Sequence, residues 1–150
     1  MSARKVSPVV WRAFLLASAV LAVSSRADAQ DLQTPPAVVA GLEAFTAAGP
    51  DSAIAVWFRG APFDSPDSRE TMRRAFDTMH RQAGRMSGYD VVRTFPVGAR
   101  IRRVFAVLHY ERHPGYLLVD AYESPSGWSL LNISFNDDAE KVFPPALLLP

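Results

Sequence analysis

The chain has 150 residues, with 16 Lys and Arg against 15 Asp and Glu, and it contains no cysteine. The lack of cysteine excludes disulfides, thiol catalysis and thiolate metal sites. A formal charge of +1 lacks the basic surplus of a typical nucleic-acid binding protein.

The N-terminal residues have the pattern of an export signal. Basic residues up to Arg12 precede the apolar run Ala13–Val23, which is shorter than the roughly 20 residues that span a bilayer. Ala27-Asp28-Ala29 has the small-x-small form of a cleavage site. We therefore expect cleavage near Ala29 and a secreted or periplasmic protein without a stable membrane anchor.

The predicted cleavage changes the charge of the chain and sets its domain boundaries. The leader holds 4 of the 16 basic and 1 of the 15 acidic residues, so 12 and 14 remain, a formal charge of −2. This charge predicts no nucleic-acid partner. We interpret residues 1–29 as the signal peptide, 30–36 as a flexible arm, 37–143 as a single domain and 144–150 as an apolar tail.

Two short helices are predicted at the start of the domain. Apolar residues between Val38 and Phe45 recur at helical spacing, and Gly49-Pro50 ends the first helix. Asp51 or Ser52 then suits the cap of a second helix, which reaches Trp57 and Phe58. We expect Trp57 either to cap the end of the fold or to line the mouth of a pocket.

A third helix has the clearest signals. Ser65 suits the N-cap and Pro66 the first helical position, and Gly84 or Gly88 ends the helix. An apolar stripe at helical spacing predicts the side that faces the core. The stripe consists of Met72, Ala75, Phe76, Met79 and Ala83.

From Tyr89 onward the pattern changes to strands. Four apolar runs, separated by short turns rich in Pro and Gly, cover residues 89–95, 100–112, 116–124 and 127–135. Short turns between strands favour an antiparallel meander. The chain is therefore predicted to be an α+β domain in which three N-terminal helices pack on a curved four-stranded antiparallel sheet.

This organisation resembles the nuclear transport factor two-like superfamily, which has a cystatin-like, cone-shaped fold, and in particular its small exported members of unassigned function. The superfamily includes isomerases, hydrolases, dehydratases and binding domains, so the resemblance implies a fold and no particular reaction. Its members often dimerise through the open sheet face, which makes a homodimer one expectation. The resemblance covers most of residues 36–143 and is carried by the helix ending in Gly84, the Tyr89 strand, Tyr110-Glu111, and Tyr122-Glu123 with Gly127-Trp128.

The stretch HYERH places two histidines and a glutamate at alternate positions. On a strand, His109, Glu111 and His113 share one face, and these residue types suit a metal triad. The two histidines would lie roughly 13 Å apart along an extended strand, although both must reach a metal ion at about 2 Å. We therefore predict no metal site.

A different use of His109 follows if Pro114-Gly115 forms a two-residue turn. His109 then lies opposite Asp120 on the next strand. A carboxylate that holds one imidazole nitrogen orients the other as a general base. A structural ion pair is the alternative, and a three-residue loop would turn His109 to the other face.

Two polar residues are candidates for ligand binding beside Asp120. Tyr122 shares its face, and the resemblance implies substrate binding or proton transfer for tyrosine and aspartate on the concave sheet face. Asn132 lies opposite Asp120 if the final turn has three residues, whereas Leu131 does so if it has two.

Two functional hypotheses follow. The first is an exported binding or interaction module with a small pocket between helices and sheet, whose partner is an unknown small molecule or protein. The alternative is a small acid–base enzyme of the isomerase or hydratase type that uses His109 and Asp120. Because the chain has no Gly-rich phosphate loop or serine nucleophile elbow, we predict no cofactor and favour the binding module.

Overall fold

A computed structural model describes residues 33–148, so the predicted signal peptide lies outside the described residues. Within this range three helices precede a sheet of four antiparallel strands in the order β1-β2-β3-β4, which does not close into a barrel. The predicted α+β meander is therefore confirmed. The elements are α1 (Pro36–Ala48), α2 (Pro50–Trp57), α3 (Pro66–Ala83), β1 (Met86–Pro96), β2 (Ile101–Tyr110), β3 (Gly115–Ser124) and β4 (Gly127–Asn136), followed by 3₁₀ turns at Ala139–Lys141 and Pro145–Leu147.

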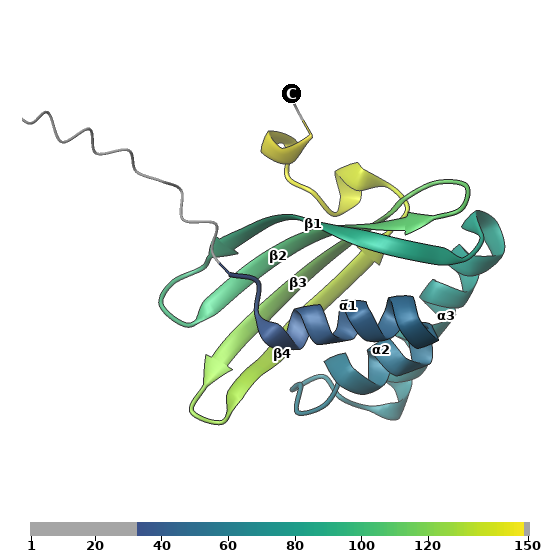
Figure 1. Ribbon diagram of the computed structural model, residues 1–150. Coiled ribbons are helices and arrows are strands. Elements are labelled where there is room, and N and C mark those ends of the chain that lie inside the picture. The colour runs from purple at the N-terminus through teal and green to yellow at the C-terminus, as the bar shows by residue number, and fades with distance from the viewer. Residues whose placement is uncertain (1–32, 149–150) are drawn as a thin grey trace, which may run out of the picture.

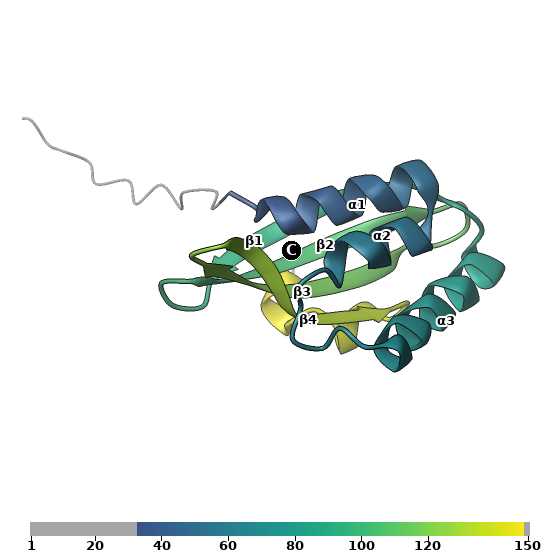
Figure 2. The ribbon, with the colours of Figure 1, turned by 90° about the horizontal axis from the view of Figure 1, so that it is seen from below.

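The two faces of the sheet are covered by different parts of the chain. The helices lie against one face, and the C-terminal turns lie across the other, as Figures 1 and 2 show from two directions. We call these the helix face and the strap face, where the strap is residues 137–148. None of the helices in the described part of the chain has the length and hydropathy needed to cross a membrane.

The boundaries of the helices follow from local chemistry. Gly49 adopts a φ of 88°, which favours glycine, and its N–H donates to the Phe45 carbonyl at the end of α1. Pro50 then occupies the first position of α2. The side chain of Ser65 accepts a hydrogen bond from the N–H of Ser68 at 3.1 Å, which caps α3. Gly84, with a φ of 86°, ends α3 as one of the two predicted glycines.

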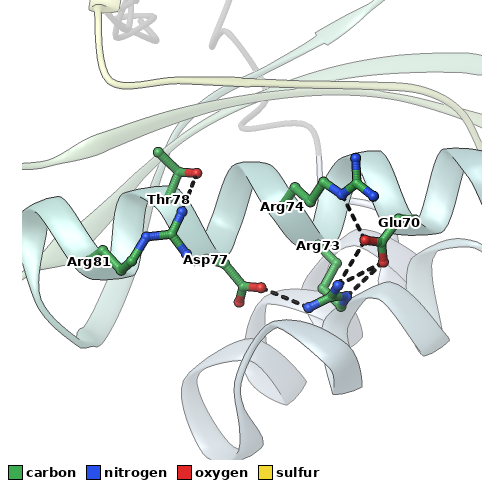
Figure 3. Close-up of polar contacts among 6 residues, drawn as sticks. All are labelled: Glu70, Arg73, Arg74, Asp77, Thr78 and Arg81. Carbon is green, nitrogen blue, oxygen red and sulfur yellow. Dashed lines mark hydrogen bonds and ion pairs between the residues drawn. The ribbon is translucent and has the colours of Figure 1, made fainter.

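The exposed side of α3 carries a network of ion pairs (Figure 3). Arg73 bonds Glu70 and Asp77, both at 2.8 Å, and Arg74 bonds Glu70 at 2.7 Å. Hydrogen bonds from Arg73 and then Arg74 lower the pKa of the Glu70 carboxyl. These pairs join positions three and four apart, the spacing at which charged side chains stabilise a helix. We therefore interpret the network as a structural feature that stabilises α3.

The main core lies on the helix face. Trp57 is 1% exposed, and its indole N–H donates to the Val38 carbonyl at 3.2 Å. Its ring also packs near the rings of Phe45 and Phe76. At Gly41 a Cβ would lie 1.9 Å from the Trp57 indole nitrogen, so glycine is required for α1 and α2 to pack this closely. Trp57 therefore belongs to the interior.

A second, smaller cluster lies on the strap face. Phe143 of the strap packs edge-to-face against Phe105 of β2 and Tyr116 of β3, with ring centroids 5.3 Å apart in both pairs. Val142 is buried beside them, and Leu147 packs against the cluster. The apolar C-terminal segment thus covers part of a face that would otherwise meet water.

The N-terminal end of the described chain also contacts the sheet. The hydroxyls of Thr34 and Thr94 lie 3.1 Å apart, and Pro35 is buried. Thr34 and Pro35 belong to residues 30–36, which were predicted to form a flexible arm. They join the start of α1 to β1.

Three residues interrupt the regular strand pairing. Ser87 and Val92 are extra residues in β1, and Leu131 is an extra residue in β4. Each is a bulge, which leaves one residue unpaired and increases the local twist of the strand.

Candidate functional site

The pairing of β2 with β3 differs from the predicted pairing. Arg103 lies opposite Asp120, and the last pair joins Leu108 to Gly115. The predicted two-residue turn at Pro114-Gly115 is wrong, because Gly115 already belongs to β3 and the connection is formed by residues 111–114.

Two packing contacts account for this longer connection. A Cβ at Gly115 would lie 2.7 Å from the ring of Phe135, so the glycine serves close packing. In the connection itself, the guanidinium of Arg112 donates to the Gln82 carbonyl at 2.9 Å, and its backbone N–H donates to the Ala83 carbonyl at 2.9 Å. The loop is therefore used to cap the C-terminal end of α3.

The predicted His109–Asp120 pair is not formed, because each residue has another partner. The carboxylate of Asp120 accepts two hydrogen bonds from Arg103, at 2.7 and 2.9 Å, and its side chain is 14% exposed. This hydrogen bonding raises the pKa of Arg103. The Nε2 atom of His109 lies 2.8 Å from Asp90 of β1, with side chains 45% and 75% exposed. Both pairs lie on the strap face.

The other strap-face candidates gather near Asp120. Asn132 lies directly opposite Asp120 even though the final turn contains only two residues, Pro125 and Ser126. The bulge at Leu131 shifts the register by one residue. The turn therefore has two residues, yet Asn132 faces Asp120 as was expected for a three-residue turn. Tyr122 lies half-buried opposite Ile101.

The alternate residues of HYERH do not converge on one point. Glu111 faces Arg85 at 3.9 Å, and His113 Nδ1 lies 3.2 Å from the carbonyl oxygen of the neighbouring Pro114. Across residues 33–148 no group of three or more His, Asp or Glu side chains is placed to hold a metal ion.

The helix face contains a cavity of about 390 Å³, which has the volume of a small ligand-binding pocket. Its lining residues come from the ends of α1 and α3 and the start of β1, and these ends of the elements lie at the right-hand side of Figure 1. Three apolar side chains, Phe45, Phe76 and Met86, form part of its wall. The remaining lining residues are Thr46, Ala47, Ala48, Gly49, Pro50, His80, Arg85 and Tyr110.

Tyr110 is the buried polar residue of this cavity. The residue is 8% exposed, and its hydroxyl has no hydrogen-bond partner among the described residues. Burial raises the pKa of this phenol, so it stays neutral and keeps its proton. A neutral buried hydroxyl is suited to donate a hydrogen bond to an acceptor on a bound molecule.

The charged side chain among the described residues that line the cavity is a cation, Arg85. Arg85 lies immediately before β1, and its only acidic neighbour within 4 Å in the described chain is Glu111, at 3.9 Å. His80 contributes an imidazole from the last turn of α3. Of the described residues that line the cavity, none is acidic. Apolar walls with an arginine, a histidine and a phenol suit a mainly apolar molecule that carries one anionic group.

Tyr110 is the second residue of HYERH, yet sequence reasoning singled out only other residues of that stretch as ligands or catalysts. The alternation of β2 contains the missing signal. Val104, Ala106 and Leu108 are apolar and lie on the helix face, and Tyr110 continues that series. The odd-numbered His109 therefore had to lie on the other face.

Comparisons of the chain with protein-family models, with curated proteins and with solved structures found no match.

Proposed function

We propose that the protein is an exported binding module that holds a small, mainly apolar molecule with one anionic group in the helix-face cavity. The buried hydroxyl of Tyr110, which has no partner in residues 33–148, carries this proposal. Leaving such a group unsatisfied costs about 1–3 kcal/mol, and an acceptor oxygen on a ligand would recover part of that free energy. Arg85 would add attraction for a carboxylate.

The family, compartment and assembly of the protein are part of the same proposal. The order of helices and strands supports membership of the nuclear transport factor two-like superfamily, and the pattern of residues 1–29 supports export and cleavage. A homodimer through the sheet remains a further proposal, and light scattering would test it.

The observed side-chain pairs do not support the acid–base enzyme. It required His109 and Asp120 to act together, but these side chains bind Asp90 and Arg103 respectively. Neither borders the helix-face cavity. The polar groups of that cavity favour holding an anion.

Calorimetric titration of the purified protein with hexanoate tests the proposal. We expect saturable binding that Arg85→Ala and Tyr110→Phe each weaken about ten-fold, the usual effect of losing a hydrogen bond to a charged group. Arg59→Ala is the matched control, because Arg59 is also an exposed arginine and lies outside the cavity lining. Absence of saturable binding, or equal weakening by the control variant, would contradict the proposal.

A further inference from the structure

A second, more open hollow lies beside the helix-face cavity. This hollow, which we call the side groove, is lined by Glu43, Thr46, Ala47, Gly88 and Tyr89 and has a volume of about 390 Å³. Thr46 and Ala47 line both spaces, so the two are neighbours along the last turns of α1. Figures 1 and 2 both show α1 lying alongside β1, where the groove is formed.

The chemistry of the two spaces differs. The side groove is mostly apolar, and its one charged lining residue in the described chain is Glu43. The cavity is instead lined by Arg85, His80 and Tyr110. An anion would be repelled by Glu43 and attracted by Arg85. The pair of spaces therefore has a polar end that accepts a negative charge and an apolar end that does not.

We infer that the ligand is a free long-chain carboxylate, with its anionic end in the cavity and its hydrocarbon chain along the side groove. This inference rests on the proposed function, because it requires the cavity to bind the anionic group. A monomer fits better than a bilayer surface, because the Tyr110 hydroxyl lies inside the fold and the head group must enter to approach it.

Titration with a series of monomeric carboxylates from hexanoate to dodecanoate tests the inference. Burial of one methylene strengthens binding by up to about four-fold, so we expect the affinity to rise with chain length and then level off once the groove is filled. Arg85→Ala should weaken every member of the series by a similar factor, because it acts on the shared anionic end.

A pair of α1 variants locates the chain. Glu43→Leu extends the apolar surface of the side groove, so it should strengthen dodecanoate binding several-fold and leave hexanoate unchanged. Ala40→Leu is the control, because Ala40 is an exposed residue of the same helix outside both linings. An equal gain in the control would overturn the assignment of the chain to the groove.

The outcomes separate this inference from the proposed function. Hexanoate binding with no dependence on chain length would overturn the inference and leave the proposed function standing. Loss of all carboxylate binding would overturn both. Binding to phosphatidylglycerol vesicles without binding of monomeric dodecanoate would also overturn the inference, because the source of the anion would then be a membrane.

Discussion

The two faces of the sheet differ in how their polar residues are satisfied. On the strap face Asp120 is paired with Arg103, and His109 with Asp90. On the helix face the hydroxyl of Tyr110 is buried with no partner in the described part of the chain. Polar groups that pair with each other are accounted for as structural contacts. A buried polar group without a partner in the protein still has a hydrogen bond to offer to another molecule. The buried group without a partner thus lies on the same face as the cavity.

The largest expected effect concerns the core of the helix face. Phe76 is fully buried and packs against the rings of Phe45 and Phe135 at 4.7 and 4.8 Å between centroids. Phe76→Ala should lower the free energy of unfolding by about 3–5 kcal/mol, because it leaves a cavity in a packed core. Urea denaturation measures this change, and Thr71→Ala on the exposed side of α3 is the control.

The strap face should be less sensitive to the same kind of truncation. Phe143 is buried in a smaller cluster, and we expect Phe143→Ala to lower the free energy of unfolding by about 2–3 kcal/mol, at or below the range for a full core. Hexanoate binding should be unchanged, because the cavity lies on the other face. If Phe143→Ala proved as damaging as Phe76→Ala, the strap would have to be counted as part of the main core.

Tyr110→Phe separates stability from binding. Removal of a buried hydroxyl without a partner in residues 33–148 should raise the free energy of unfolding of the ligand-free protein by about 1 kcal/mol. The same variant should bind hexanoate more weakly, as expected above. Denaturation and calorimetry on one preparation measure both. A loss of stability would show that the hydroxyl already has a partner in the folded protein.

The smallest effects are expected for the strap-face ion pairs. Asp120→Ala leaves the half-exposed Arg103 able to reach water, so it should lower the free energy of unfolding by about 1 kcal/mol. His109→Ala removes a more exposed contact and should change it by less than about 0.5 kcal/mol. A double-mutant cycle with Arg103→Ala measures the coupling to Asp120. A large effect of His109→Ala would reopen a role for this residue.

Local signals in the sequence were sufficient for the order of the elements and for the ends of α1 and α3. Ser65 caps α3 through its own side chain, and Gly49 and Gly84 end helices because each adopts a positive φ. These effects act between residues a few positions apart, so they can be recognised without knowledge of the tertiary structure. The three predicted helices and four strands follow within the described residues.

The strand register could not be predicted from the sequence, because contacts between residues far apart in the chain determine it. Gly115 was interpreted as a turn residue, but the ring of Phe135, from another strand, is what requires a glycine there. Arg112 binds carbonyl groups at the end of α3, some thirty residues earlier in the chain. One bulge at Leu131 likewise changed which residue faces Asp120. The predicted His109–Asp120 pair is not formed because the longer connection between β2 and β3 changes the register of these two strands.

Trp57 shows the same limit for a single side chain. Its position at the end of the second predicted helix was compatible with capping the end of the fold and with lining a pocket mouth. Its burial depends on Gly41 of α1, whose missing side chain makes room for the indole. Sequence spacing alone does not reveal such a complementary pair.

The three bulges have a consequence for the behaviour of the protein at high concentration. All of them lie in β1 and β4, the two strands at the borders of the open sheet. A border strand with regular geometry offers its free backbone groups to another molecule and so promotes aggregation, whereas a bulge twists that border out of alignment. Ser87, Val92 and Leu131 therefore protect this uncapped sheet against edge-to-edge growth into fibres.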